Sequence, residues 1–587
     1  MSVPAALDRY VGTFVAALAA SGVRHAVIAP GSRNTPLILA LTSETSGIRP
    51  WLHLDERSAG YFALGIARQL DEPVAIVCTS GTAAANFLPA VVEARLSRVP
   101  LVVLTADRPP ELRDVGAAQT IDQVRMFGSH AKWAVDMPVV TGKSQLDQYA
   151  ASAAARAAAL AIAVPAGPVH LNFPFREPLV DDTPAPSIPT MTTIEPADRG
   201  VIAPSEAVVD RVARLASGRH GLLVAGPESG GLPAEAIVAL AAALGWPVVA
   251  DPLSGLRTGR HDLSRVIDRA DVLAREPALT ERATPEVVIR FGAAPTSKPL
   301  NLWLGSLEPL DYVVVDAAVG GPAGLRDPDA LSSMVVQADP RLLCEALLIV
   351  APTETPTSWL ASWTEANRAA GDALDAAIEG LSEPFEGSAS RALAAALPDG
   401  ATLVVGNSMP VRDVDSFFLS VPREIRLLGT RGASGIDGVV STAVGAASVD
   451  QPVALLIGDL SFFHDQNGLW PVHRYGLNLT VVLVNNDGGG IFEFLPQRQL
   501  VGERFEPWFG TPHGLDFHHV VAQYGGRHSL LEGDGRAMIA EALARPGLDV
   551  LELRTERARN MELHREVFEA ARVAIRASLE AAPTPGS

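Results

Sequence analysis

The stretch VVLVNNDGGGIF, residues 481–492, joins an apolar run to two amides, a carboxylate and three glycines. Ordinary turns use one or two such residues. The unbroken apolar run is typical of a strand in a parallel sheet, where helices cover both faces. In open parallel sheets, ligands bind outside the carboxyl ends of the strands. The stretch therefore predicts an α/β fold with a polar site at the tip of a buried strand.

The same alternation of short apolar runs and Ala/Leu-rich helical segments extends through most of the 587 residues. This alternation is the pattern of parallel α/β domains. A proline-rich, poorly patterned stretch at 177–200 reads as a linker, and a second seam is expected at 351–358. Because one core cannot support a chain of this length, we expect three parallel-sheet α/β domains, at residues 1–185, 200–360 and 385–580.

Composition narrows the class of protein. The net charge of −19 disfavours nucleic acid and anionic membranes as partners, although a local arginine cluster can still bind a small anion. No apolar run is long enough to span a membrane, and the apolar segment at 11–22 lacks the positive flank of a secretion signal, so we read it as a buried helix. The two cysteines, Cys78 and Cys344, have no metal-binding spacing. We expect a cytoplasmic protein without an integral membrane segment.

A second predicted strand also ends in a polar residue that could act together with Asn486. The run VALLIGD ends at Asp459, 27 positions before Asn486, which is about one β-α-β unit. The two side chains are therefore expected on neighbouring strand ends, where their oxygens suit Mg²⁺ and a bound phosphate. A backbone carbonyl from the glycines can add a third oxygen, and Gly458 lets a phosphate approach N–H groups at a helix start. Either half alone is better explained as an ordinary turn, whereas the pair at this spacing favours a metal site.

The pair GDL and NN resembles the signature of thiamine-diphosphate-dependent enzymes, with Leu460 where a third glycine is usual. The resemblance implies three domains of the thiamine-diphosphate-dependent decarboxylase type. It also implies that Asp459, Asn486 and the Gly488 carbonyl hold Mg²⁺, with Mn²⁺ as a substitute, on the diphosphate. The cofactor-binding residues that it implies are Glu56, Ser408, Ile436, Gly458, Asp459, Leu460, Ser461, Asn486, Gly488 and Ile491.

Thiamine chemistry needs a carboxylic acid beside N1′ of the aminopyrimidine, because the acid drives the ring into the imino form that deprotonates C2. A water-poor position raises the pKa of such an acid. Glu56, in HLDERSAG at a first-domain strand tip, is the candidate catalytic residue. The alternative for Asp55-Glu56-Arg57 is a charged turn with a local ion pair. The predicted metal and diphosphate site at Asp459 and Asn486 favours the catalytic role of Glu56.

Most of the first and third domains resembles the 2-succinyl-5-enolpyruvyl-6-hydroxy-3-cyclohexene-1-carboxylate synthases of menaquinone biosynthesis. The motifs that carry the resemblance are GSRNTPL, HLDERSAGYFALG, TSGTAAAN, ADRPPEL, GNSMPVRDVD, RGASGIDG and NNDGGGIF. It implies decarboxylation of 2-oxoglutarate and 1,4-addition of the succinyl carbanion equivalent to isochorismate. It also implies pyrimidine-binding, central and diphosphate-binding domains with the cofactor between two subunits. A homodimer would then be the minimum unit, and a homotetramer is common in the family.

Both implied substrates carry two carboxylates, which arginine binds through paired hydrogen bonds. By the resemblance, isochorismate would contact Ser32, Arg33, Arg108, Gln119 and Lys298, the 2-oxoglutarate-derived part would contact Arg412 and Arg431, and the pocket wall would include Ile491, Phe492 and Leu495. Ile436 would prop the bent cofactor. Each arginine alone could equally form a surface ion pair, and the apolar residues could be plain core. One departure is Ala118, where the family often has Asn.

Two other functions stay open at this point. Another thiamine-diphosphate-dependent 2-oxo acid decarboxylase or carboligase, similar to acetolactate synthase, would need fewer arginines. A non-catalytic paralogue that binds a nucleotide or stabilises a complex would need neither Glu56 nor the pair Asp459 and Asn486. The sequence assigns no role to Asn485 or Asp487.

Overall fold

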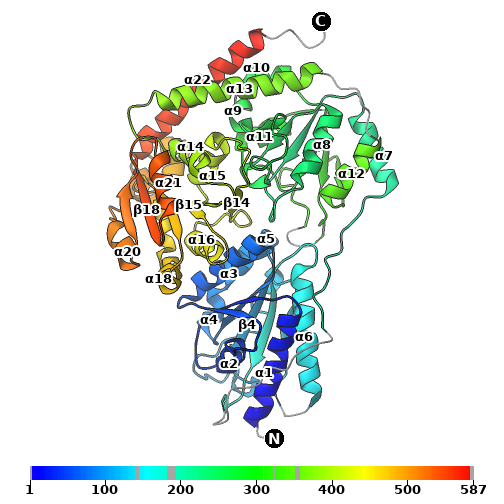
Figure 1. The fold of residues 1–587 in the computed structure, drawn as a ribbon, viewed down its shortest axis with the longest axis vertical. Helices are drawn as coiled ribbons and strands as arrows, with labels where there is room; N and C mark the ends of the chain where they lie inside the picture. Colours follow the sequence, from blue (N-terminus) through cyan, green and yellow to red (C-terminus); the bar gives the residue numbers. More distant parts are fainter. Residues whose placement is uncertain are drawn as a thin grey trace.

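The computed structural model describes residues 3–140, 144–180, 194–308, 310–320, 324–350 and 357–581. They form three six-stranded parallel sheets flanked by helices, which confirms the predicted fold class. Figure 1 shows the first domain at one end of the molecule and the other two side by side beyond it. The expected linker and seam fall largely outside the described ranges, and the domain boundaries stay predictions. No described helix has the length and apolarity needed to cross a bilayer.

The first domain is built on a sheet of strand order β2-β1-β3-β4-β6-β5. Its strands are β1 (His25–Ile28), β2 (Arg49–Leu52), β3 (Val74–Cys78), β4 (Leu101–Asp107), β5 (Ala134–Asp136) and β6 (Val169–Pro174). Its helices are α1 (Val3–Ala20), α2 (Thr35–Leu41), α3 (Glu56–Leu70), α4 (Thr82–Asn86), α5 (Leu88–Leu96) and α6 (Ser144–Ile162). Phe14 and Leu18 of the expected first helix are fully buried in α1.

The middle domain has strand order β12-β11-β10-β7-β8-β9, which is that of doubly wound nucleotide-binding folds. Its strands are β7 (Gly221–Ala225), β8 (Val248–Ala250), β9 (Val266–Ile267), β10 (Val287–Phe291), β11 (Asp311–Val315) and β12 (Met334–Val336). Its helices are α7 (Glu206–Ala216), α8 (Ala234–Leu244), α9 (Ala270–Leu273), α10 (Pro277–Arg282), α11 (Lys298–Gly305) and α12 (Pro340–Val350), followed by α13 (Thr357–Glu379).

The third sheet, β14-β13-β15-β16-β18-β17, repeats the strand order of the first. Its strands are β13 (Thr402–Val405), β14 (Arg426–Gly429), β15 (Val453–Gly458), β16 (Leu479–Asn485), β17 (Arg527–Leu530) and β18 (Leu548–Arg554). Its helices are α14 (Glu386–Ala396), α15 (Met409–Phe417), α16 (Val439–Ala447), α17 (Asp459–His464), α18 (Trp470–Tyr475), α19 (Gln497–Leu500), α20 (His518–Gln523) and α21 (Arg536–Ala544), before the last helix α22 (Arg557–Ala581).

The last helix connects the third domain to the middle one. α22 runs beside α13 across the top of both domains (Figure 1). Leu563, Val567 and Ile575 of α22 belong to the same buried apolar cluster as the strands of the middle sheet. The end of the chain, expected in the third domain, therefore also completes the core of the middle domain.

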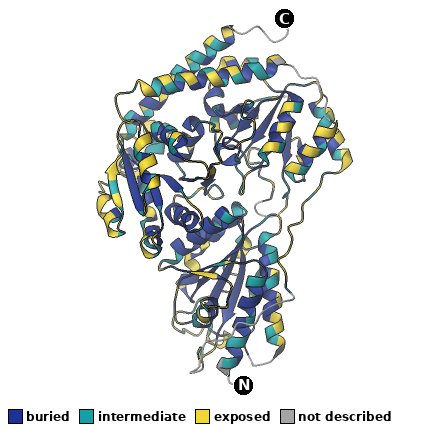
Figure 2. Ribbon diagram, viewed as in Figure 1, coloured by how far each residue is buried: buried dark blue, intermediate teal, exposed yellow. Residues whose placement is uncertain are grey.

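The first and third domains share a buried contact between α3 and α16. Residues of both helices belong to one apolar cluster, and Figure 2 shows this contact as dark as the strands of the sheets. The Tyr61 hydroxyl donates to Asp437 Oδ2 at 2.8 Å across the contact. The relative position of the two domains is therefore set by packed side chains as well as by the chain connections.

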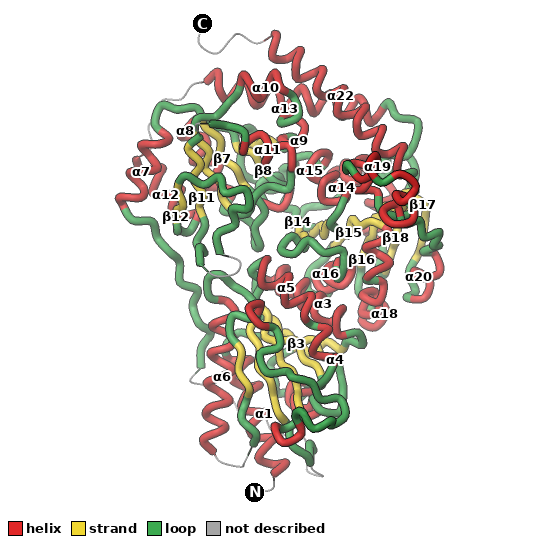
Figure 3. The backbone as a smooth tube through the Cα atoms, turned by 180° about the vertical axis from the view of Figure 1, so that it is seen from behind, coloured by secondary structure: helices red, strands yellow, loops and turns green. Residues whose placement is uncertain are grey.

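The carboxyl edges of these two sheets face different ways. The Glu93 carboxylate, near the C-terminus of α5, accepts the N–H groups of Gly432 and Ala433, which follow β14. Because α5 runs antiparallel to the strands, its C-terminus lies at the amino edge of the first sheet. Figures 1 and 3 both show α5 at the end of the first domain that meets the third, and Figure 1 shows α2, which follows β1, at the opposite end.

Candidate active site

Asp459 and Asn486 lie side by side at the carboxyl edge of the third sheet. Gly458, the last residue of β15, pairs with Val484 of β16. Asp459 begins α17, and its Oδ2 atom accepts the N–H groups of Asn486 at 3.2 Å and Gly488 at 2.9 Å. The two strand tips that the sequence pairs by spacing are therefore in direct contact.

The donor atoms at this edge fit a divalent cation. The Asn486 side chain is 8% exposed, and its Oδ1 atom has no hydrogen-bond partner among the described residues. Leaving a buried polar atom unpaired costs about 1–3 kcal/mol. Burial raises the pKa of Asp459, so an adjacent cation would stabilise its charged form. Mg²⁺ takes carboxylate, amide and carbonyl oxygens of this kind.

Backbone shape at position 488 also suits such a site. Gly488 has φ of 138°, and a Cβ atom there would lie 1.9 Å from the Gly510 carbonyl oxygen. Only glycine fits, so the chain can turn sharply beside Asp459. In the described ranges, no cluster of three or more His, Cys, Asp or Glu side chains is arranged to hold a metal. A cation here would depend on Asn486 and a backbone carbonyl together with Asp459.

Arg412 and Arg431 supply positive charge at the same edge. Arg412 Nη1 donates to the carbonyl of Ser408, the residue before α15. Arg431 Nη1 donates to Asn407 Oδ1 at 2.9 Å. Burial, and then the nearby charge of Arg431, lowers the pKa of Arg412, and burial lowers the pKa of Arg431. Neither guanidinium forms an ion pair with a carboxylate in the part of the chain that the structure describes.

Other predicted cofactor and pocket-wall residues lie at or after the ends of β14, β15 and β16. Ile436 is 36% exposed, and its carbonyl accepts a hydrogen bond from Ser461 Oγ at 2.6 Å. Leu460, Gly458, Ile491, Phe492 and Leu495 are half-buried. Phe492 also packs edge-on against Phe509, with ring centroids 5.4 Å apart, so packing accounts for part of its role.

The predicted isochorismate residues of the first domain form a separate group. Ser32, Arg33, Arg108 and Gln119 lie at the carboxyl edge of the first sheet, after β1 and β4. Arg108 Nη1 donates to the Gln119 carbonyl at 2.8 Å, and burial followed by the charge of Arg33 lowers the pKa of Arg108. Arg33 already pairs with Glu177 at 2.9 Å. Arg108 and Gln119 are therefore hydrogen-bonded, and Arg33, whose charge acts on Arg108, is held by its own ion pair.

Glu56 is the first residue of α3, and Asp55 caps the helix through the N–H groups of Arg57 and Ser58. Hydrogen bonds tie the neighbours of Glu56 to residues 464–467 of the third domain. They run from Arg57 Nη2 to the His464 carbonyl at 2.7 Å, from Ser58 Oγ to Asp465 Oδ1 at 3.3 Å and from Asn467 Nδ2 to Asp55 Oδ2 at 3.3 Å. The half-buried Glu56 carboxylate has no bonded partner among the described residues.

The structure thus brings the predicted residues together in two groups within one chain. The candidate metal ligands, Ile436, Arg412 and Arg431 share the edge of the third sheet, whereas Glu56 and the first-domain candidates for isochorismate share the edge of the first. Lys298 stands apart, exposed in the first turn of α11 in the middle domain. The two edges face different ways within one chain.

Comparisons with known proteins agree with the three-domain fold. Residues 9–126 match the N-terminal binding domain of thiamine pyrophosphate enzymes, 204–405 their middle domain and 417–553 their C-terminal binding domain. A 2-succinyl-5-enolpyruvyl-6-hydroxy-3-cyclohexene-1-carboxylate (SEPHCHC) synthase of Geobacillus thermodenitrificans is 48% identical, covering 96% of each chain. One of Chloroflexus aurantiacus is 45% identical, again covering 96% of each chain. The chain belongs to the SEPHCHC synthase family.

SEPHCHC synthases are thiamine-diphosphate-dependent enzymes of menaquinone biosynthesis, so membership confirms the expected enzyme class. A crystal structure described as a thiamin diphosphate-dependent enzyme from Mycobacterium smegmatis superposes with a TM-score of 0.66. The superposition covers 91% of this chain and 96% of that chain at 20% identity, which supports the fold alone.

The structure also shows residues that the sequence reasoning missed. His513 Nε2 lies 3.2 Å from Asp459 Oδ2 in this SEPHCHC synthase family member. Asp487, to which the sequence assigned no role, accepts the N–H groups of His513 and Gly514 at 2.8 Å each. Asn485 donates to Glu552 Oε1 at 2.6 Å. No spacing rule links these positions, so only the fold reveals that Asp487 holds the turn that carries His513.

A second missed residue is Asn407, next to Ser408 at the tip of β13. Its Nδ2 atom donates to the carbonyls of Thr430 at 2.9 Å and Gly435 at 2.7 Å, while its Oδ1 accepts Arg431. Asn407 therefore orients Arg431 and fixes the loop that presents Ile436. The only sequence signal was its place at a strand tip.

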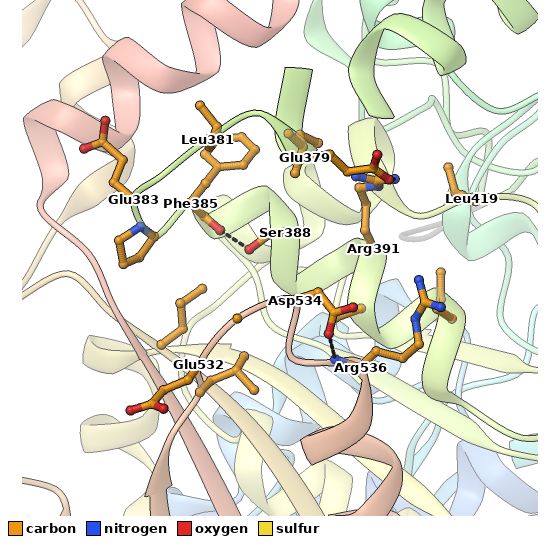
Figure 4. A pocket seen from close by; sticks show the side chains of 18 of the residues that line it. Glu379, Leu381, Glu383, Phe385, Ser388, Arg391, Leu419, Glu532, Asp534 and Arg536 are labelled. Atoms are coloured by element: carbon orange, nitrogen blue, oxygen red, sulfur yellow. Dashed lines mark hydrogen bonds and ion pairs between the residues drawn. The ribbon is translucent and has the colours of Figure 1, made fainter. Parts of the chain in front are cut away.

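A large cavity lies away from these residues. It has a volume of about 730 Å³ and opens between the α13–α14 connection and the loop before α21. Figure 4 shows Glu383, Arg391, Glu532 and Asp534 around it. None of the predicted SEPHCHC synthase site residues lines this cavity. By contrast, Arg431 lines a smaller cavity of about 420 Å³ between the domains.

Proposed function

We propose that this enzyme decarboxylates 2-oxoglutarate and adds the resulting succinyl carbanion equivalent to isochorismate, giving SEPHCHC and CO₂. The C1–C2 bond of 2-oxoglutarate breaks, and its electron pair is used in the new carbon–carbon bond to the isochorismate ring. A proton completes the adduct. The proposal is supported by the family of the chain and by the chemistry of its two polar edges.

One observation carries the substrate assignment. Arg412 and Arg431 are neighbouring cations without a carboxylate partner in the described residues, at the same edge as the candidate metal ligands. A substrate with one carboxylate, such as pyruvate, loses that carboxylate on decarboxylation and leaves nothing for both guanidinium groups to bind. 2-Oxoglutarate retains its distal carboxylate, which an arginine fork matches.

In this proposal, bound thiamine diphosphate supplies the electron sink that makes decarboxylation feasible. Asp459, Asn486 and the Gly488 carbonyl would hold Mg²⁺ or Mn²⁺ on the diphosphate. The cofactor would also contact Ser408, Gly458, Leu460 and Ser461. Ile436 would support its bent shape. Water would be excluded from the reacting carbon by Ile491, Phe492 and Leu495. Glu56 would hold a proton at the aminopyrimidine N1′.

We place Ser32, Arg33, Arg108, Gln119 and Lys298 at isochorismate. For these residues and Glu56 to reach the third-domain edge, a second copy must supply one of the two edges. This supports a homodimer as the minimum active unit, with a homotetramer consistent with it. A cytoplasmic location belongs to the same proposal, because Cys78 and Cys344 are both free and buried.

The test is incubation with thiamine diphosphate, Mg²⁺, 2-oxoglutarate and isochorismate, followed by mass analysis of the product and measurement of CO₂. We expect consumption of both substrates in equal amounts and a product of the mass of SEPHCHC. A parallel reaction with pyruvate replacing 2-oxoglutarate tests the carboligase alternative. Preferential CO₂ release from pyruvate would overturn the substrate assignment and favour an acetolactate-synthase-like activity.

A further inference from the structure

A buried carboxylate lies directly behind the candidate metal ligand Asn486. Glu386, the first residue of α14, is 1% exposed. Its Oε1 atom accepts a hydrogen bond from Asn486 Nδ2 at 2.8 Å. The two residues are a hundred positions apart, so no sequence pattern connects them.

This contact decides which way the Asn486 amide faces. A carboxylate oxygen of Glu386 accepts hydrogen bonds, so the amide nitrogen must point toward it and the amide oxygen away. The Asn486 Oδ1 atom is then left buried and without a partner among the described residues, although it is the atom that a cation would take. The reversed amide would place oxygen against oxygen at Glu386 and present an N–H group to the cation.

Glu386 is itself held on two sides. Thr555 Oγ1 donates to the same Oε1 atom at 2.9 Å, and the backbone N–H of Glu386 donates to Asn560 Oδ1 at 3.1 Å. The backbone N–H of Thr555 also donates to the Asn485 carbonyl at 3.0 Å. The carboxylate is therefore fixed to the same strand end whose amide it meets.

We propose that Glu386 is a positioning residue for the divalent cation: it locks the Asn486 amide with Oδ1 toward the metal. The inference rests on the proposed metal role of Asn486. Partners behind a metal ligand orient it and tune its affinity, and their loss typically costs about 10–100-fold in metal binding.

The test measures Mn²⁺ binding in the presence of thiamine diphosphate. The electron paramagnetic resonance signal of free Mn²⁺ reports how much Mn²⁺ stays unbound. We expect Glu386→Gln to weaken Mn²⁺ by about 10–100-fold, because the glutamine amide no longer selects one orientation of Asn486. Ser388→Ala is the matched control: it removes a side-chain hydrogen bond in the same first turn of α14, to the Phe385 carbonyl, and should bind Mn²⁺ nearly as wild type does. Equal weakening in both variants would indicate a general packing effect and overturn the proposal.

A reciprocal exchange separates orientation from folding. Asn486→Asp alone places two carboxylates together and should lose Mn²⁺ affinity. In Glu386→Gln/Asn486→Asp, the glutamine amide can donate to the aspartate, which turns its other oxygen to the cation, so affinity should recover relative to both single variants. Should Glu386→Gln fail to fold, Asn486→Asp is compared directly with the double variant. Absence of recovery in a folded double variant would overturn the proposal.

Wild type and Asp459→Ala complete the design. If wild type binds Mn²⁺ and Asp459→Ala does not, the metal site exists and the variants at Glu386 test positioning alone. If wild type binds no Mn²⁺ with thiamine diphosphate, the proposed metal role fails and the positioning role fails with it. If folded Glu386→Gln binds Mn²⁺ as tightly as wild type does, only the positioning role of Glu386 is wrong.

Discussion

Gly65 of α3 lies against the backbone of Thr442 in α16, so closely that a Cβ atom at position 65 would be 2.0 Å from the Thr442 carbonyl oxygen. On the other helix, a Cβ at Gly445 would be 2.1 Å from the Phe62 carbonyl oxygen. At these two glycines, the first and third domains, which carry the two halves of the candidate site, are therefore in direct backbone contact through α3 and α16. Such contacts leave no room for any side chain.

Gly65→Ala should therefore destabilise the protein. Overpacking of this kind costs about 1–3 kcal/mol, because the backbone of α16 cannot move aside as a flexible side chain can. The midpoint of urea unfolding should fall. Gly305→Ala is the control, since a Cβ there meets only Leu331 at 3.6 Å. An equal response of the two variants would contradict the close contact.

Glu56→Gln should retain the fold and cofactor binding but lose turnover by about 10²–10⁴-fold, the range for a general acid–base group. The Glu56 carboxylate has no hydrogen-bond or ion-pair partner in the described residues, so the change to an amide breaks no such bond. Melting temperature, thiamine diphosphate affinity and CO₂ release are measured together. Near-wild-type decarboxylation would sink the catalytic role of Glu56.

Asp459→Ala should lose the Mg²⁺-dependent part of thiamine diphosphate affinity. The change removes a charged ligand and also the acceptor of the Gly488 and Asn486 N–H groups. Titration calorimetry with and without Mg²⁺ measures the difference. Asp516→Ala, at an exposed position, is the control. An affinity that depends on Mg²⁺ as strongly as in wild type would reject the metal assignment.

Mixing two inactive variants should restore activity if each site combines a first domain from one chain with a third domain from another. In a mixed dimer of Glu56→Gln and Asp459→Ala, one site carries both changes and the other carries neither. Half of randomly formed dimers are mixed, so co-expression should recover roughly a quarter of wild-type turnover. Each variant alone is the baseline. No recovery in verified mixed dimers would show that one chain completes its own site.

Asp465 should impose a pH dependence on stability. Burial raises the pKa of this fully buried carboxyl to about 7 from the ordinary 3.8, although it accepts hydrogen bonds from Ser441 and Ser58. The folded protein therefore holds this proton more tightly than the unfolded chain, and the free energy of unfolding falls as pH rises from about 4 to about 7.

Asp465→Asn cannot ionise and should lose that part of the pH dependence. The free energy of unfolding of Asp465→Asn, relative to that of wild type, should increase as the pH rises from about 4 to about 7. Melting temperatures of both proteins across the window give the comparison, and other titrating groups cancel in the difference. Parallel curves for the two proteins would contradict the raised pKa of Asp465.

The sequence by itself determined the sheet type and the half of the candidate site that is local in the chain. Asp459 and Asn486 are separated by one β-α-β unit, and the right-handed crossover brings consecutive strand tips together whatever the rest of the protein does. Continuous apolar runs likewise predicted strands buried on both faces. The resemblance carried by longer motifs then identified the family, which the comparisons confirmed.

Only the tertiary structure decided how distant segments meet. Glu386 lies behind Asn486 and His513 beside Asp459 because separate elements converge there, and no periodicity or spacing encodes such contacts. The same holds for α22, which completes the core of the middle domain. The packing of α3 on α16 turns the carboxyl edges of the first and third sheets in different directions. Strand patterns report which face of an element is buried, but the angle between two domains depends on side-chain fit across their interface.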